Sequence, residues 1–447
     1  MTTRGFDGQI IGPADRDYDA HREVWNAMVD RRPALIARCT SASDVAAAVR
    51  HAREADLEIG VKCGGHSVLG LSVPDGGLMV DLTPMGDVRV DLATRRATVG
   101  GGALLRYLDQ ASQAHGLATT AGNVSHTGVG GLTLGGGMGW LARQFGLACD
   151  NVEAYTLVTA DGETLRVTAT EHPDLFWGLR GGGGNFGIVT GFEFRLHPVA
   201  GQATVVELTF EAADAYEPMR RWRDLLADAP RPATLTADAV TADGRPVVIL
   251  GYVWVGDPAE AKAYARTMRQ IGTPRSEDIR EMTYLELQTI GDANHHHGKR
   301  RYANGHYLAE LTDGAIEAFL SRGAGEDDGW RTASGGGFQA YGGAIAEVED
   351  DDSAFSHRGT LVEFFGGHTW TDPAEDAERM ASARAYGAAM APFASGVYVN
   401  VLSERGEEGV RRAYGDEKLR RLRDLKALYD PDNVFHLNQN IAPAPRA

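Results

Sequence analysis

Glycine is spread very unevenly along this chain, and its clusters limit what the chain can fold into more than any other feature. Fifty-six glycines occur in 447 residues. Four of the five clusters lie before residue 200, at 64–65, 100–102, 128–139 and 181–187, and the fifth lies at 335–337. Since glycine has no Cβ, such segments let the backbone approach a ligand closely and point successive amides at it. We therefore expect a ligand site in the first part of the chain.

One cluster carries a histidine directly after a strand-like segment at 57–61. Its residues are Lys62, Cys63, Gly64, Gly65, His66 and Ser67. An imidazole beside such a turn can act as a base, a metal ligand or a covalent tether for a cofactor. Taken alone, an ordinary turn histidine is the simpler interpretation, so the role of His66 depends on the rest of the chain.

Composition narrows the class of function. The length indicates two or three domains, and the net charge of −17 argues against nucleic acid, which needs a basic surface. Cys39, Cys63 and Cys149 are too few and too scattered for a disulfide framework or a zinc site. The N-terminus has no apolar signal region and no stretch reaches membrane-spanning length. We expect a cytoplasmic protein with no membrane partner, either a monomer or a homodimer.

Hydrophobic patterning predicts a mixture of strands and helices before residue 200, where His197-Pro198 marks a boundary. Ser41 or Ser43 can cap the first long helix. Strands are expected at 33–38, 57–61, 78–82, 88–91, 96–99, 156–159, 165–167 and 188–196, and helices at 46–55 and 104–115. After the boundary, strands at 204–210, 247–253 and 360–365 alternate with helices at 213–226 and 258–270, and a last helix covers 417–428.

Several familiar motifs can be set aside. Residues 182–187 match G-x-G-x-x-G, but a strand-like segment follows them, which excludes a Rossmann site. The P-loop and G-x-S-x-G patterns are absent from the sequence. The three histidines at 295–297 are interpreted as a polar loop, which can face a substrate pocket, and no metal is predicted. The acidic run at 349–352 is expected to be a solvated loop.

Taken in order, the remaining segments resemble the vanillyl-alcohol-oxidase superfamily, specifically its berberine-bridge-enzyme-like branch of FAD-linked oxidases. The resemblance spans essentially the whole chain. It is carried by residues 64–67, 127–139, 143–151, 175–187, 355–358, 398–400 and 429–441.

The resemblance implies an α+β fold with three parts. Residues 1–200 would be a PCMH-type FAD-binding domain of two subdomains, and residues 201–395 an α+β substrate domain with an antiparallel sheet over the flavin. Residues 396–447 would be a berberine-bridge-like segment that returns to the FAD domain. His66 would be bonded to the 8α methyl carbon of the flavin, which prevents dissociation and raises the reduction potential.

The resemblance also places a set of residues around FAD, with the amides of 63–67 on the pyrophosphate. The set is Lys62, Cys63, Gly64, Gly65, His66, Ser67, Gly70, Thr127, Gly128, Gly131, Leu132, Gly137, Asn151, Gly187, Val189, Tyr398, Asn400, Asn438 and Asn440.

Three positions depart from the pattern of the family. Val124 stands where many members carry a second, cysteinyl flavin bond, so we predict a single covalent bond. Cys63 is interpreted as an amide donor of the pyrophosphate loop. Leu132 replaces a histidine found in many plant members, so another group must stabilise negative charge on the reduced flavin.

Thr127 opposite Leu132 resembles bacterial polyketide-tailoring members that form an oxygenated flavin N5 species. The alternative is that Thr127 has only a packing role.

The first functional hypothesis is an FAD-dependent oxidase that abstracts hydride from a small organic substrate, expected to be a natural product, with O2 reduced to H2O2. Leu361, Glu363 and Phe365 share one strand face, so Glu363 can project toward the ring as the base, with its pKa raised by burial. A salt-bridged structural Glu363 is an equal alternative, and Tyr398 is the second candidate base. Pocket-lining candidates are Tyr302, Gln339 and Tyr341.

Two other hypotheses stay open. One is a monooxygenase that uses the flavin-N5 oxygen to tailor a polyketide-like substrate in secondary metabolism, with Thr127 and Leu132 in the oxygen pocket. The other is a protein that keeps the fold without redox chemistry. The identity of the substrate is not expected to follow from the sequence.

Overall fold

The first long helix shows how local sequence starts the fold of the computed structural model, which describes residues 5–323 and 333–445. Ser41, rather than Ser43, caps α2 (Ala42–Glu54), because its Oγ accepts a hydrogen bond from the Asp44 amide at 3.2 Å. The helix buries Val45 and Val49 in the core of the first sheet. That sheet has the order β1 (Gln9–Ile11), β2 (Leu35–Arg38), β4 (Leu78–Asp81) and β3 (Ile59–Lys62).

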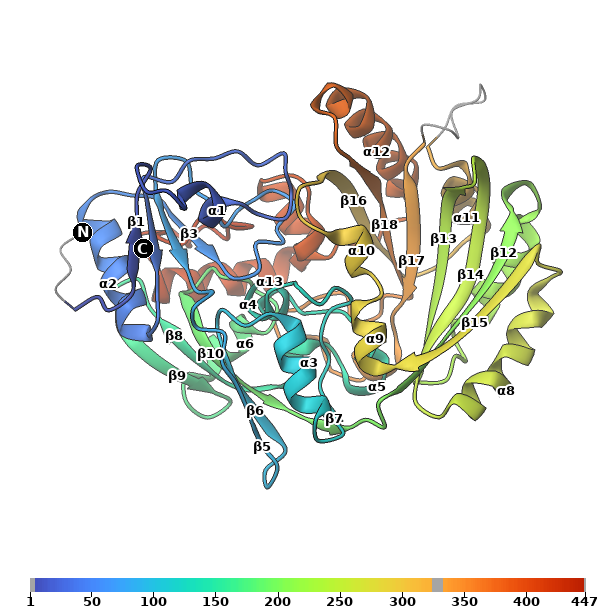
Figure 1. Ribbon diagram of the computed structural model, residues 1–447, viewed down its shortest axis with the longest axis horizontal. Helices are drawn as coiled ribbons and strands as arrows, with labels where there is room; N and C mark the ends of the chain where they lie inside the picture. Colours follow the sequence, from blue (N-terminus) through green and yellow to red (C-terminus); the bar gives the residue numbers. More distant parts are fainter. Residues whose placement is uncertain (1–4, 324–332, 446–447) are drawn as a thin grey trace.

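The second sheet is antiparallel and lies beside the first (Figure 1). Its order is β5 (Val88–Asp91), β6 (Arg96–Gly100), β10 (Ile188–Arg195), β8 (Val152–Val158) and β9 (Thr164–Thr168), with a small pair of β7 (Leu117–Ala118) and β11 (His197–Pro198) nearby. Helices α1 (Tyr18–Arg22), α3 (Leu105–Gln113), α4 (Val129–Leu134), α5 (Ala142–Phe145) and α6 (Pro173–Leu179) belong to this half of the chain.

A seven-stranded antiparallel sheet forms the other half of the molecule (Figure 1). Its order is β15 (Ser276–Thr283), β12 (Gln202–Glu211), β14 (Arg245–Val255), β13 (Ala233–Ala242), β17 (Gly335–Ala340), β18 (Val362–Trp370) and β16 (Arg300–Leu308). One face is buried under α7 (Tyr216–Asp224), α8 (Pro258–Met268), α11 (Asp313–Ser321) and α12 (Asp376–Met390). The opposite face is therefore turned toward the N-terminal sheets, with α9 (Tyr284–Thr289) and α10 (Asp292–His295) between the two halves.

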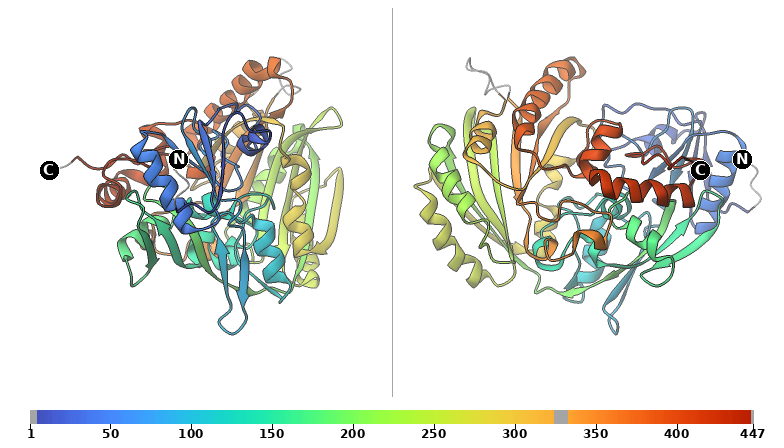
Figure 2. Two further views of the ribbon diagram at one scale, coloured as in Figure 1. Left: turned by 60° about the vertical axis from the view of Figure 1, so that its left-hand side comes forward. Right: turned by 180° about the vertical axis from the view of Figure 1, so that it is seen from behind.

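The C-terminal helix α13 (Glu407–Tyr429) brings the chain back to the N-terminal half, as the view from behind in Figure 2 shows. Its Leu422 and Leu425 join the same core as α6. The following tail is fixed by Lys426, which is fully buried and whose Nζ donates to Asp430 Oδ2 at 2.6 Å and to the Phe435 carbonyl at 2.9 Å. This arrangement places the tail against the glycine-rich loops.

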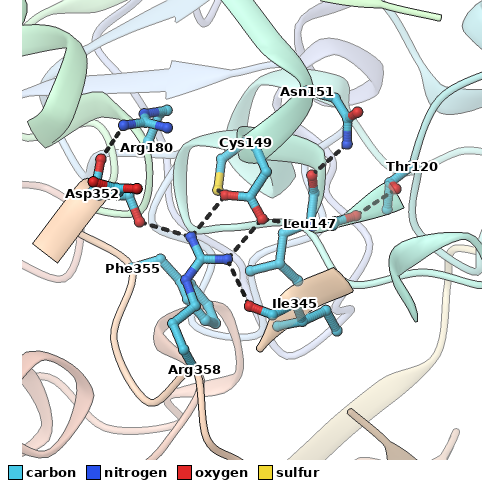
Figure 3. A network of polar contacts seen from close by, with 12 residues as sticks. Thr120, Leu147, Cys149, Asn151, Arg180, Ile345, Asp352, Phe355 and Arg358 are labelled. Carbon is cyan, nitrogen blue, oxygen red and sulfur yellow. Dashed lines mark hydrogen bonds and ion pairs between the residues drawn. The ribbon is translucent and has the colours of Figure 1, made fainter. Parts of the chain in front are cut away.

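A buried ion pair links the turn before β8 to the segment that precedes β18 (Figure 3). Both guanidinium nitrogens of Arg358 donate to Asp150, each at 2.7 Å, and one of them also donates to Ser353 Oγ at 2.7 Å. The two side chains are only 4% and 6% exposed. The pair therefore fixes one half of the molecule against the other without water between the charges.

The predicted α+β fold class is confirmed, and so is the exclusion of a Rossmann site, because residues 182–187 lie between α6 and β10 rather than before a helix. Several boundaries differ from the predictions. Residues 360 and 361 precede β18, and α13 begins ten residues before the predicted 417, with a non-helical kink at Gly415. The acidic run at 349–352 has exposed side chains, as predicted, but its backbone carbonyls bind Trp177, Arg180 and Lys418. The division of the chain at residues 200 and 395 remains a proposal.

Within residues 5–323 and 333–445, no helix combines the length and the apolar character that crossing a bilayer would require.

Candidate cofactor and active site

A cavity of about 470 Å³ lies where the glycine clusters, the seven-stranded sheet and the C-terminal tail meet. The glycine loops contribute Gly64, Gly65, Gly128, Gly131, Gly183 and Gly184 to its wall. The sheet contributes Phe365, and the tail contributes Leu437, Asn438 and Gln439. Segments more than 300 residues apart in sequence thus form one site.

The glycines show that this cavity is shaped for a ligand. A Cβ added to Gly64 would lie 2.3 Å from the Gly128 amide nitrogen, and one added to Gly128 would lie 2.4 Å from the Gly64 nitrogen. These two loops therefore pack backbone against backbone. A Cβ at Gly131 or Gly184 would meet no described atom within 4 Å, although both residues line the cavity. The space kept open there is consistent with a bound molecule close to the backbone.

The cavity wall also holds polar atoms that lack partners. Among the described residues, Asn438 Oδ1, Gln439 Oε1 and Asn123 Oδ1 are buried and accept no hydrogen bond. Leaving such groups unpaired costs about 1–3 kcal/mol each. A ligand rich in hydrogen-bond donors would satisfy them, which fits the ribityl chain and adenine of FAD.

His66 stands in the cavity wall with both ring nitrogens engaged. Its Nε2 lies 2.7 Å from His126 Nδ1, and its Nδ1 lies 3.3 Å from Thr127 Oγ1. The Trp25 ring stacks on it with centroids 4.9 Å apart. Burial is the largest cause that lowers the pKa of His66, to about 2. The imidazole is therefore neutral, so one of its two nitrogens carries a lone pair that can act as a nucleophile.

Most of the predicted cofactor residues line this cavity. They are Cys63, Gly64, Gly65, His66, Ser67, Thr127, Gly128, Gly131, Leu132, Gly187, Val189, Tyr398, Asn400 and Asn438. Tyr398 is also part of the scaffold, since its hydroxyl accepts hydrogen bonds from the Gly137 amide at 2.9 Å and from Asn400 Nδ2 at 2.8 Å.

Five predicted cofactor residues lie outside the lining, and for four of them the local contacts give the reason. The Lys62 ammonium donates to the carbonyls of His21 and Glu23, so it anchors the N-terminal segment. Asn151 donates to the carbonyls of Phe145 and Leu147. Gly70 packs on Val29, and the Gly137 amide donates a hydrogen bond to the Tyr398 hydroxyl. Asn440 is the fifth residue outside the lining.

Glu363 is not part of the cavity lining, but it lies two residues before Phe365, which is, on the same strand. Since alternate residues of a strand share a face, Glu363 and Phe365 project to the same side of β18. Glu363 is paired in register with Tyr307 and Gln339, and its carboxylate accepts a hydrogen bond from the Tyr341 hydroxyl at 2.8 Å. Burial raises the pKa of Glu363 to about 7. No ion pair to Glu363 occurs among the described residues, which argues against the salt-bridged alternative.

None of the three pocket-lining candidates, Tyr302, Gln339 and Tyr341, belongs to the cavity lining, so this prediction was wrong, and the three divide between the two faces of the sheet. Gln339 lies on the cavity side, where its Oε1 accepts a hydrogen bond from Asn123 Nδ2 at 2.9 Å, and Tyr341 contacts Glu363. Tyr302 lies on the opposite face of the sheet. That ring packs with Trp370 and Ala383 of α12 on the helix-covered side, because its position in β16 has the opposite parity to Tyr307.

Sequence reasoning missed two contributors. Trp25 lies in a segment without regular periodicity, so no pattern indicated that it stacks on His66. The histidine run was interpreted as a polar loop that can face a substrate pocket, and His295 does line the cavity, but the contact of His297 with His66 and His126 was not foreseen. The ring nitrogens of His66, His126 and His297 lie within 4.8 Å of one another, a set that could also hold a metal ion. In the sequence, the only sign of this cluster was the run of three histidines at 295–297, which matches no metal-binding motif.

Comparison with known proteins decides the family. The family model described as "FAD binding domain" matches residues 33–168, and the model described as "Berberine and berberine like" matches residues 397–442. The (R)-6-hydroxynicotine oxidase of Paenarthrobacter nicotinovorans is 31% identical over 461 residues, which cover 99% of this chain and 98% of that protein. The chain belongs to the berberine-bridge-enzyme-like family of FAD-linked oxidoreductases.

Solved structures agree with this assignment. The 6-hydroxy-D-nicotine oxidase from Arthrobacter nicotinovorans superposes with a TM-score of 0.88 at 29% identity, covering 98% of each chain. The glucooligosaccharide oxidase from Acremonium strictum also gives a TM-score of 0.88, at 26% identity with 98% of each chain covered, and is described as carrying a 6-S-cysteinyl, 8α-N1-histidyl FAD. This FAD-linked oxidoreductase therefore shares its family's fold over nearly its whole length, and FAD is its cofactor.

Proposed function

We propose that this protein is an FAD-dependent oxidase that removes hydride from a carbon of a small organic substrate and passes the electrons to O2, yielding H2O2. The observation that carries the proposal is the combination of a neutral His66 in the cavity wall with a buried Glu363, whose pKa is about 7, two residues from the cavity-lining Phe365 on the same strand. When bound, FAD supplies the hydride acceptor and the route to O2.

The backbone of the glycine loops would hold the cofactor. Gly64, Gly65, Gly128 and Gly131 let the chain approach the pyrophosphate, and Asn438 and Gln439 offer acceptors that are otherwise unpaired. Thr127, Leu132, Gly187, Val189, Tyr398 and Asn400 would complete the site. Leu132 contributes an apolar wall, while its carbonyl accepts a hydrogen bond from Asn400 at 3.1 Å.

A single covalent bond through His66 fits the groups present. The glucooligosaccharide oxidase is described with both a histidyl and a cysteinyl bond, and we infer that only the first forms here. Val124 lines the cavity where the resemblance places the second attachment. Cys63 does not replace it as a nucleophile, because burial raises the pKa of its thiol to about 11 and its Sγ donates to the Ala103 carbonyl at 3.3 Å.

Glu363 is the base that we favour over Tyr398. With its pKa near 7, the carboxyl can lose its proton at neutral pH and then accept one from a substrate O–H or N–H. Burial and the nearby Glu363 raise the pKa of Tyr398, so the phenol stays protonated. Tyr398 would instead hold the loop at Gly137 and the side chain of Asn400 in place.

The test is the stoichiometry of turnover with a panel of cyclic amines, oligosaccharides and phenolic alcohols, chosen because relatives include a hydroxynicotine oxidase and a glucooligosaccharide oxidase. An oxidase releases one H2O2 per oxidised substrate and puts no oxygen atom from O2 into the product. Incorporation of an atom of ¹⁸O2 into the product would instead favour the monooxygenase that Thr127 opposite Leu132 suggests. Failure of every substrate to bleach the flavin anaerobically would contradict both.

A further inference from the structure

Three histidines from separate parts of the chain meet next to the cavity wall that His66 forms. His66 follows β3, His126 precedes α4, and His297 follows α10. The ring centroids of His66 and His126 are 4.7 Å apart, and their facing nitrogens are 2.7 Å apart. His297 touches both rings at greater distance, with centroids 6.2 Å from His66 and 5.7 Å from His126. The contact between His66 and His126 is therefore the one of hydrogen-bond length.

The hydrogen bonds around this pair favour one arrangement of protons. A neutral imidazole has one N–H and one lone pair. In the arrangement where the Thr127 hydroxyl donates to Nδ1 of His66, the His66 proton sits on Nε2 and points at Nδ1 of His126. His126 then carries its own proton on Nε2, an atom that is buried and has no partner among the described residues. Nδ1 of His66 is left as the nitrogen that can form a bond.

We propose that His126 is the base for covalent attachment of FAD to His66: it takes the Nε2 proton of His66 as Nδ1 bonds to the 8α carbon. The proposal rests on the tether at His66 proposed above. One C–N bond forms, and one C–H bond and one N–H bond break. Two electrons pass through the flavin to O2, and the two protons complete H2O2.

The surroundings of His126 suit this role. The neighbouring Ser125 holds Asp292 at the site, with its Oγ 2.6 Å and its amide 3.0 Å from the carboxylate. This anion favours the protonated form of His126, whereas burial lowers the pKa of His126 below its ordinary value, as do the nearby Arg106 and Arg301. His126 is therefore neutral before the reaction, ready to accept a proton, and is helped by Asp292 once it has done so.

The test measures attachment rather than turnover. Full-length protein expressed under riboflavin limitation is mixed with FAD in air, and intact mass after acid precipitation gives the fraction that has gained FAD less two hydrogens. His126→Asn places an amide oxygen near the position of Nδ1, which keeps a hydrogen-bond acceptor but not a base. We expect attachment about 10²-fold slower, with the Kd for non-covalent FAD within about twofold of wild type.

His297→Asn is the matched control, since it removes a neighbouring histidine that does not contact His66 at hydrogen-bond length. It should attach FAD at the wild-type rate. His126→Ala should be slow, and added imidazole should restore its rate, which a purely structural defect would not allow.

Three results would overturn the proposal. His126→Asn could attach FAD at the wild-type rate, or could fail to bind FAD at all, which would make His126 a binding residue. The rate of FAD attachment could instead fall equally in His126→Asn and His297→Asn. If a chelator slows attachment in wild type to the same degree, and added zinc restores it, the three histidines hold a metal. If wild type attaches no FAD, or His66→Ala attaches it equally well, the tether itself fails, and that outcome is distinct from a failure of His126 alone.

Discussion

At the scale of single residues, Glu363 determines how the reaction should respond to pH. The carboxylate is the active form and its pKa is about 7, so kcat/KM should rise as the pH is raised through about 7 and then level off. Glu363→Gln should lower kcat by about 10²–10⁴-fold with little change in KM. Steady-state rates of H2O2 release across pH check both. A profile that stays flat through neutral pH would remove Glu363 from the mechanism.

Tyr341 gives a second test on the same carboxyl. Its hydroxyl donates to Glu363 at 2.8 Å, and this hydrogen bond lowers the pKa of Glu363 against the larger effect of burial. Tyr341→Phe removes the hydrogen bond, so the rise in kcat/KM should move to higher pH while the plateau is largely kept. A shift toward lower pH, or no shift, would show that the titrating group is not Glu363.

At the scale of elements, α13 and the tail depend on one buried lysine. Lys426 and Asp430 are both fully buried, and Lys426 also donates to the Asn185 carbonyl at 2.7 Å. Lys426→Met leaves the Asp430 carboxylate unpaired, which should cost about 3–5 kcal/mol in the free energy of unfolding. Denaturant unfolding measures this loss. Arg420→Met, at an exposed position of the same helix, should change the stability little.

The same substitution should also weaken FAD binding, because the tail after Asp430 supplies Asn438 and Gln439 to the cavity. This is best measured as the Kd for FAD in a His66→Ala background, where the cofactor cannot be tethered. An unchanged Kd beside lowered stability would show that the tail keeps its place without Lys426.

Elements were predictable from the sequence where local signals were strong. Ser41 and the alternation around β10 identify α2 and that strand within a few residues. Strands β13, β16 and β17 were not predicted, since Gly335 to Gly337 open β17 with no side chains to show alternation. The cavity loops could be assigned from their glycines together with the family resemblance. The histidine cluster could not, because contacts between residues 66, 126 and 297 are set by tertiary packing.

At the scale of the whole molecule, the buried pair of Arg358 with Asp150 joins the segment before β18 to the turn before β8. Arg358→Ala leaves Asp150 buried without its cation and should cost about 3–5 kcal/mol, and Arg358→Lys should cost less because it keeps the charge but loses the two-pronged geometry. Thermal unfolding followed by flavin fluorescence measures this loss of stability.

The exposed pair of Arg231 with Glu347 is the control, and Arg231→Ala should cost at most about 1 kcal/mol. Equal losses in the two alanine variants would contradict a special role for the buried pair.

The tethered cofactor is the central claim at this scale, because it joins the glycine loops, His66 and the returning tail into one catalytic unit. The most direct measurement is acid precipitation of the purified yellow protein, followed by intact mass of wild type and of His66→Ala. The account predicts that the flavin stays with the wild-type chain, adds the mass of one FAD less two hydrogens, and is released from His66→Ala. Flavin released from the wild-type chain, or retained by His66→Ala, would contradict it.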